Sequence, residues 1–185
     1  MRVIAGKHKG RQLRTVADLS VRPATSRVKG SVFNILQNRV DWPLAQVLDL
    51  FAGSGSLGIE ALSRGARRAV FVENSRRAVE YLRQNLAAIA ASECEVIAAD
   101  VFEYLARPRG QFDVVFADPP YEFEVLQRLP SMIFRSGVVS QDGYLIIEHP
   151  QELRFEESPL CAAADVRKYG RTVVTFFQSR LESRP

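Results

Sequence analysis

The four consecutive residues from Asp118 to Tyr121 are of types that could hold a nucleobase by its exocyclic amine. Pro119 and Pro120 restrict the backbone and prevent a helix from starting at once, so the Asp118 carboxylate and the Pro119 carbonyl remain as hydrogen-bond acceptors. A nucleobase amine is a poor nucleophile because its lone pair is delocalised into the ring. Two acceptors bound to its hydrogens favour a pyramidal nitrogen that exposes the lone pair to a methyl carbon, and positioning of this kind lowers a reaction barrier. Tyr121 adds an aromatic face on which an extruded base can stack. The tetrapeptide therefore predicts methyl transfer to a base amine; the alternative is a proline-rich turn with an incidental tyrosine.

A glycine-rich segment at residues 53–58 has the pattern G-x-G-x-x-G between an expected strand and an expected helix. This pattern alone suggests a dinucleotide site. Asp49 lies four residues before Gly53, however, and there its carboxylate would face the negative pyrophosphate of a dinucleotide. A cofactor with an ammonium and a sulfonium group would be attracted instead. S-adenosylmethionine carries both, and its own carboxylate could bind the amides at the N-terminus of the following helix. The segment therefore predicts S-adenosylmethionine as the cofactor.

Two further acids follow expected strands. Glu73, 18 residues after Gly55, could accept hydrogen bonds from both ribose hydroxyls of the cofactor, and Asp100 could accept one from the adenine amino group. The alternative for Asp100 is a helix N-cap. No metal is expected, because the two histidines and two cysteines lack the spacing of metal ligands. The predicted cofactor-binding residues are Asp49, Phe51, Ala52, Gly53, Gly55, Glu73, Asn74, Asp100, Val101 and Asp118.

Strands and helices that alternate along the chain must position these residues. We expect strands at 47–51, 69–73, 95–99, 112–117 and 144–148, helices at 56–64, from 74 or 75 onward, at 101–105 and around 124–134, and a closing hairpin at 166–178. Such alternation predicts an α/β fold with a mostly parallel sheet covered by helices on both faces. Ligands bind such sheets beyond the carboxyl ends of the strands. The acids and the glycine-rich segment all follow expected strands or end them, so we expect them to meet at that edge.

The N-terminal part of the chain is strongly basic. Residues 1–40 hold nine Lys/Arg and one acid, a net charge of +8, whereas the remaining 145 residues carry −4, which gives the total of +4. We expect a hairpin at 2–16 with basic residues at its tip, followed by a helix from 25 or 26 onward. This charge distribution favours a polyanionic partner at one end of the molecule; the alternative is a solvated basic face without a partner. We therefore expect a basic extension at 1–43 and a catalytic domain at 44–180.

Length and composition exclude several protein classes. A chain of 185 residues, 46% of them hydrophobic, can bury a sizeable core without disulfides or a metal. It has no apolar run near the ~18 residues of a membrane span, and its basic start lacks the apolar region of a secretory signal. Cys94 and Cys161 are far apart and form no CxxC pair, which fits a reducing compartment. We expect a cytoplasmic protein that binds no membrane.

The two motifs together resemble a known family. Asp-Leu-Phe-Ala-Gly-Ser-Gly-Ser-Leu-Gly at 49–58 and Asp-Pro-Pro-Tyr at 118–121 are similar to the amino-group methyltransferases, and the details most resemble the RsmD family of 16S rRNA guanine-N2 methyltransferases. Three more stretches carry this narrower resemblance: Arg-Val-Ile-Ala-Gly-Lys-His-Lys-Gly-Arg at 2–11, Arg-Pro-Ala-Thr-Ser-Arg-Val-Lys at 22–29 and Glu-Ala-Leu-Ser-Arg-Gly-Ala at 60–66. The family pattern usually has a threonine and an acid where this chain has Ala24 and Gly30.

The resemblance implies a Rossmann-like, seven-stranded class I S-adenosylmethionine-dependent methyltransferase fold. It also implies methylation of N2 of one loop guanine in 16S rRNA, on a 30S subunit or an assembly intermediate, and we expect a monomer. On this basis Asp118, the Pro119 carbonyl and Tyr121 are the catalytic residues. The implied RNA-binding residues are Lys7, Lys9, Arg11, Arg22, Arg27 and Tyr121.

Three other functions stay open. A DNA adenine-N6 methyltransferase would use the same tetrapeptide, although 185 residues leave little room for a segment that reads a DNA sequence. A nicotinamide-dependent oxidoreductase would bind NAD at the glycine-rich segment. A non-catalytic RNA chaperone would use only the basic N-terminal part.

Overall fold

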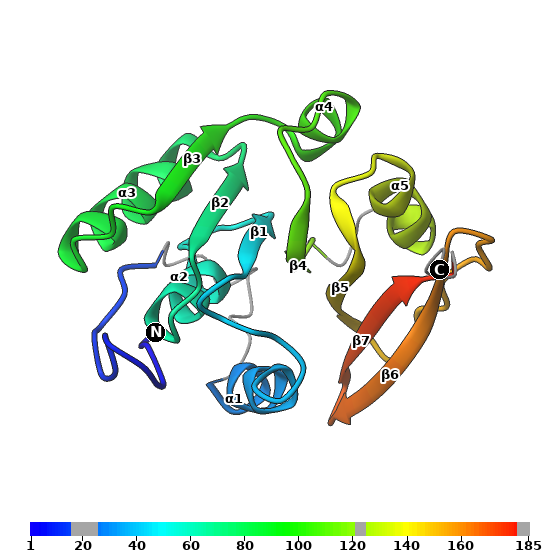
Figure 1. Cartoon of the computed structure of the whole chain (residues 1–185), viewed down its shortest axis with the longest axis horizontal. Coiled ribbons are helices and arrows are strands. Elements are labelled where there is room, and N and C mark those ends of the chain that lie inside the picture. The colour runs from blue at the N-terminus through cyan, green and yellow to red at the C-terminus, as the bar shows by residue number, and fades with distance from the viewer. Residues whose placement is uncertain (16–25, 121–124, 181–185) are drawn as a thin grey trace.

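The computed structural model describes residues 1–15, 26–120 and 125–180. Within these residues, seven strands form one sheet in the order β3-β2-β1-β4-β5-β7-β6 (Figure 1). The strands β1 to β5 are all parallel to one another, and β7 is antiparallel to both β5 and β6. The predicted α/β fold with a mostly parallel sheet and a closing hairpin is therefore confirmed. The strands are β1 Gln46–Leu50, β2 Arg68–Glu73, β3 Cys94–Ala98, β4 Phe112–Ala117, β5 Val139–Pro150, β6 Cys161–Tyr169 and β7 Thr172–Ser179.

Helices cover both faces of the sheet (Figure 1). Successive side chains of a strand point to opposite faces, so Val47 belongs to one apolar core and Leu48 to the other. The first core packs against α1, α2 and α3, and the second against α4, η1 and α5. Among the described helices, none is both long and apolar enough to cross a lipid bilayer. The helices are α1 Ser26–Leu36, α2 Ser56–Ser63, α3 Arg76–Ala88, α4 Val101–Ala106, α5 Leu129–Arg135 and the 3-10 helix η1 Leu126–Arg128.

The fifth strand is longer than the sequence predicts. It begins at Val139, which pairs with Phe112, and after an irregularity in the register Tyr144 pairs with Val114. The first part of β5 was not predicted, because the polar residues before Tyr144 do not alternate regularly between apolar and polar.

The helix expected around 124–134 is divided. The structure has the turn η1 and then α5, whose first turn contains Pro130. Proline lacks the N–H that a helix interior needs, so a helix begins at proline more readily than it continues through one.

The N-terminal segment 1–15 turns back on itself as the expected hairpin does, but with short pairing: one antiparallel bridge joins Arg2 and Gln12, and Val3 N donates to Arg11 O at 3.0 Å. It is held against α2: Lys7 N donates to Ser63 O at 2.7 Å. Gly6 has a φ of +80° and approaches α2 so closely that a Cβ would lie 1.8 Å from the same carbonyl oxygen. Antiparallel pairing of its two arms and contact with α2 together determine the path of this segment. Its apolar side chains join the first core, and the division at residues 43 and 44 stays a prediction.

Candidate active site

The strands β1 to β4 are parallel, so their carboxyl ends lie along one edge of the sheet. The register places the ends of β2 and β4 on either side of the end of β1, and the end of β3 beside β2. The segments that follow these strands are therefore neighbours. The structure brings Glu73, Asp100 and Asp118 to the same edge as the glycine-rich segment 53–58, which is the grouping that the sequence predicts.

Two glycines let α2 begin directly at this edge. Gly55 has a φ of +79°, and a Cβ there would lie 2.3 Å from Cδ1 of Leu82 in α3. A Cβ on Gly58 would lie 2.3 Å from Cε1 of Phe71 in β2. Larger residues at either position would push α2 away from its neighbouring helix and strand, and the turn that precedes it would move as well.

Asp49 is buried beneath this turn, with 2% of its surface exposed. Its Oδ2 accepts a hydrogen bond from the N–H of Gly58 at 2.8 Å. Burial raises the pKa of Asp49 to about 8; the bond from Gly58 opposes this rise, and the charges of Asp118 and Glu73 add to it. Asp49 therefore anchors the start of α2, and a cation held nearby would favour its ionised form. Direct contact of Asp49 with a cofactor ammonium stays a prediction.

Glu73 and Asp100 are both bonded to backbone amides. Glu73 Oε2 accepts from Gly53 N at 2.7 Å, and Oε1 accepts from Ser75 N at 2.8 Å. Asp100 Oδ1 accepts from Phe102 N at 2.8 Å and caps α4, so the N-cap alternative is confirmed. Since a carboxylate oxygen can accept two hydrogen bonds, both groups keep the capacity to bind hydroxyl or amino donors of a nucleoside.

Asp118 directly follows β4 and is half-buried, with Pro119 buried and Pro120 exposed beside it. Burial raises the pKa of Asp118 to about 7. Because its charge also raises the pKa of Asp49, the two carboxylates repel each other when both are ionised. Tyr121 lies outside the described residues, and its stacking on a base stays a prediction.

The four other residues predicted to bind the cofactor lie beside these acids. Phe51 has a φ of +58°, which is rare for a bulky side chain and marks a strained turn after β1. Ala52 N donates to Val72 O at 3.1 Å, which ties this turn to β2. Asn74 is exposed, and Val101 is buried as the first residue of α4.

The residues implied to bind RNA lie mainly on the N-terminal segment. Lys7 and Lys9 are exposed there, and Arg27 is exposed on α1. Arg11 Nη2 donates at 2.6 Å to the carbonyl of the last residue of α3, where the helix dipole favours a cation. Arg22 lies outside the described residues. The turn from Lys7 to Lys9 therefore forms the basic tip of the N-terminal segment. Hydrogen bonds to α2 and to the end of α3 hold this segment in place.

Comparison with known proteins identifies the family. The family model described as conserved hypothetical protein 95 matches residues 1–178. The chain belongs to this family, the RsmD family. It is 37% identical over 186 residues to YlbH of Bacillus subtilis, which is 97% of this chain and 100% of YlbH. It is 36% identical over 152 residues to ribosomal RNA small subunit methyltransferase D of Haemophilus influenzae, which is 80% of this chain and 78% of that protein.

A solved structure agrees with this assignment. YhhF from Escherichia coli matches with a TM-score of 0.85 and 29% identity, over 98% of this chain and 99% of that chain. The resemblance to the RsmD family and the class I methyltransferase fold inferred from the sequence are confirmed.

The sequence did not predict a buried ion pair that lies next to this site. Lys29 Nζ lies 3.3 Å from Glu60 Oε2, and both side chains are 0% exposed. Lys29 also donates to Arg2 O at 3.0 Å and to Ser56 Oγ at 3.1 Å. The available signal was that Lys29 shares the apolar face of its helix with Val32 and Phe33, three and four residues later, and a charge there requires a buried partner.

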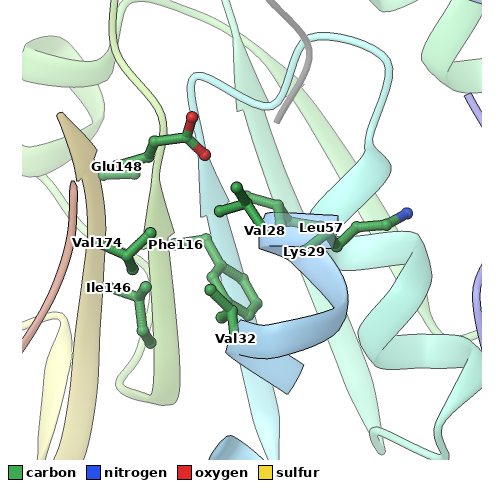
Figure 2. A pocket seen from close by; sticks show the side chains of 9 residues that line it. Val28, Lys29, Val32, Leu57, Phe116, Ile146, Glu148 and Val174 are labelled. Carbon is green, nitrogen blue, oxygen red and sulfur yellow. The ribbon is translucent and has the colours of Figure 1, made fainter. Parts of the chain in front are cut away.

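A small apolar hollow lies under the Asp118 edge, between α1 and the ends of β4 and β5 (Figure 2). It encloses about 20 Å³, which is room for about one water molecule. Figure 2 shows the Glu148 carboxylate at one end of the hollow and the Lys29 amine pointing away from it. Glu148 was also missed, although it is the last residue of an expected strand, as Glu73 is. The lining residues are Val28, Lys29, Val32, Leu57, Phe116, Ala117, Ile146, Glu148 and Val174.

Proposed function

We propose that the protein transfers a methyl group from S-adenosylmethionine to the exocyclic N2 of a guanine in the rRNA of the small ribosomal subunit. The observation that carries this proposal is the position of Asp118 and Pro119 beside the glycine-rich segment, in a chain of the RsmD family. The relative in Haemophilus influenzae is named a methyltransferase of small-subunit rRNA, which supports the class of substrate.

The charge of the site supports the cofactor. Asp49, Glu73 and Asp118 put three carboxyl groups at one edge of the sheet, which suits a cationic sulfonium and ammonium and opposes a pyrophosphate. S-adenosylmethionine, when bound there, supplies an electrophilic methyl group. This charge pattern and the family both favour a methyltransferase over the nicotinamide-dependent alternative. We assign cofactor binding to Asp49, Phe51, Ala52, Gly53, Gly55, Glu73, Asn74, Asp100, Val101 and Asp118.

Asp118 and the Pro119 carbonyl hold the two hydrogens of the guanine amine, and Tyr121 stacks on the extruded ring. The N2 lone pair forms the new N–C bond while the C–S bond breaks, and S-adenosylhomocysteine leaves. N2 then loses one proton. Asp118 can accept this proton, because its pKa of about 7 leaves it partly ionised at neutral pH.

The test of the catalytic assignment is the variant Asp118→Ala. Tritiated methyl incorporation into 30S subunits is expected to fall at least about 100-fold, because a positioning acceptor is lost. Binding of S-adenosylhomocysteine, measured by calorimetry, is expected to persist. Asp142→Asn, which removes an exposed carboxylate, is the matched control and is expected to keep full activity. Unchanged incorporation with Asp118→Ala would contradict the catalytic role, and mass-spectrometric mapping of the product identifies the methylated base.

The basic extension at 1–43 is assigned to RNA binding, with Lys7, Lys9, Arg11, Arg22 and Arg27 as phosphate contacts. The double variant Lys7→Gln/Lys9→Gln is expected to weaken RNA binding and to reduce its salt dependence by about two units of slope. Arg107→Gln/Arg135→Gln removes the same charge from exposed positions on α5 and after α4, on the opposite side of the sheet. Equal effects of the two double variants would refute a specific role for the N-terminal segment.

The cellular setting follows from this substrate. We place the protein in the cytoplasm, where it acts as a monomer on the 30S subunit or on an assembly intermediate. Methylation of subunits but not of naked rRNA, and elution at the mass of one chain in size-exclusion chromatography, are the expected results. An oligomer, or preference for naked rRNA, would contradict them.

A further inference from the structure

Glu148 lies in β5, two residues before the last residue of that strand, and close to Asp118, which directly follows β4. β4 and β5 are parallel, and Phe116 pairs with Ile146 and Ala117 with Ile147, so the next step in this register places Glu148 beside Asp118. Phe116 and Ile146 face the first core, on the side of α1. Because side chains alternate along a strand, Asp118 and Glu148 project to that same side. Figure 2 shows the Glu148 carboxylate at the end of the hollow, over Ile146 and Val174.

The surface between Glu148 and α1 is apolar and shallow. Most of the hollow's lining consists of aliphatic and aromatic side chains, and its volume of about 20 Å³ is far too small for a base. A base that approaches Asp118 would therefore rest across the mouth of the hollow rather than inside it. In that position its polar edge is the part that meets the two neighbouring carboxylates.

Guanine and adenine differ at this edge. The edge of guanine presents two adjacent donors, the N1–H and the N2 amine, whereas adenine presents N1 as an acceptor next to its amine. Adjacent strands are about 4.8 Å apart, which is a spacing that lets two carboxylates bind neighbouring donors of one ring. A carboxylate opposite the adenine N1 would instead face a lone pair.

We propose that Glu148 is a specificity-determining residue that accepts the N1–H of the target guanine while Asp118 and Pro119 hold its N2 amine. This inference rests on the proposed function and adds the reason for guanine as the substrate base. Glu148 selects guanine because its carboxylate would face the N1 lone pair of adenine, and two lone pairs repel each other. It also fixes the rotation of the ring, so that N2 points to the methyl donor.

The experiment compares guanine with 2-aminopurine, which keeps the amine at C2 but has no N1–H. Full-length protein is assayed on 30S subunits reconstituted with rRNA that carries either base at the mapped position. The wild-type protein is expected to methylate guanine about 10- to 100-fold faster, the loss typical of one hydrogen bond to a charged group. Glu148→Gln is expected to bring the two rates within about 3-fold by slowing guanine alone, since a neutral amide is a weaker acceptor for N1–H.

Three controls separate this role from a structural one. S-adenosylhomocysteine affinity of Glu148→Gln is expected to stay within about 2-fold of wild type, which shows an intact fold and cofactor site. Glu148→Asp keeps the charge and is expected to give an intermediate rate ratio, and Glu152→Gln, an exposed carboxylate after β5, is expected to behave as wild type. An unchanged ratio in Glu148→Gln, or an equal fall of both rates, would overturn the role of Glu148. Failure of the wild-type protein to methylate guanine N2 would instead refute the proposed function.

Discussion

The buried carboxylate of Glu60 is expected to be a major source of stability, and Glu60→Gln tests this. Its two oxygens accept from Ile4 N at 2.8 Å, Ala5 N at 3.0 Å and Arg64 Nε at 3.0 Å, with Lys29 Nζ at 3.3 Å. Glutamine keeps the volume and one acceptor oxygen, but it removes the charge and puts an amide donor opposite other donors. The ammonium of Lys29 then loses its counterion inside the protein.

The magnitude follows from this loss of charge. Breaking a buried ion pair by removing one partner costs about 3–5 kcal/mol, and the glutamine oxygen recovers part of that, so we expect a loss of about 3 kcal/mol. Lys29→Met is expected to cost less, about 1–2 kcal/mol, because Glu60 keeps Arg64 and two amides. Glu80→Gln is the matched control, since Glu80 also pairs with an arginine four residues away, but at 3.6 Å and with its side chain 61% exposed. Its loss is expected to stay below about 0.5 kcal/mol.

Urea unfolding at several pH values measures these differences. Burial lowers the pKa of Lys29, whereas the charge of Glu60 raises it, so Glu60→Gln lowers this pKa further. A folded pKa below the unfolded one means that the folded chain binds fewer protons, and stability then rises with pH through this interval. Part of the loss in Glu60→Gln is therefore expected to disappear as the pH rises toward 10.5, the ordinary pKa of lysine. A loss equal to that of Glu80→Gln, or one independent of pH, would refute the reasoning.

Three further predictions concern the site and the N-terminal segment. The pKa values of Asp49 (about 8) and Asp118 (about 7) lie above the ordinary 3.8, so the folded chain binds more protons than the unfolded chain and stability is expected to fall from pH 5 to 8. Asp49→Asn should reduce this slope by roughly 1.4 kcal/mol per pH unit below pH 7 in urea titrations, and an unchanged slope would mean that Asp49 is already ionised. Cofactor binding is expected to release protons at pH 7, since a cation favours both carboxylates; calorimetry in buffers of different ionisation enthalpy would show none if the acids lie away from the cofactor. Gly6→Ala is expected to lower the melting temperature far more than Gly10→Ala. Both glycines have positive φ, but a Cβ at Gly6 would lie 1.8 Å from Ser63 O, whereas one at Gly10 would meet no atom within 4 Å. Equal losses would contradict the docking of this segment on α2.

The order of elements was predictable because strand and helix patterns here are local. Apolar runs such as 112–117 are bounded by turn residues, and a parallel sheet with helices on both faces is the arrangement that such alternation allows. The same rule placed Glu73, Asp100 and Asp118 at one edge. In each case it was enough to know which residue ends a strand.

Hydrogen-bond partners were not predictable in this way. The bond from Gly58 N to Asp49 Oδ2 joins residues nine apart in the chain, and it forms because the first N–H groups of α2 have no partner within the helix. The path of the N-terminal segment depends similarly on Glu60, 55 and 56 residues from the amides that it binds. Long-range contacts of this kind leave only a weak trace in the sequence, namely a charge on an apolar helix face.

Lys29 links the N-terminal segment to the glycine-rich segment. Its ammonium bonds Arg2 O in the N-terminal segment and Ser56 Oγ in the glycine-rich segment, while Glu60 binds the amides of Ile4 and Ala5. A buried charge has few alternative positions, since each would need an equally complete set of partners. The position of the basic tip is therefore tied to the start of α2. We therefore expect Glu60→Gln to weaken the binding of both S-adenosylhomocysteine and RNA, and Lys7→Gln/Lys9→Gln to weaken RNA binding alone. Unchanged S-adenosylhomocysteine affinity in Glu60→Gln would show that the N-terminal segment and the glycine-rich segment are held independently.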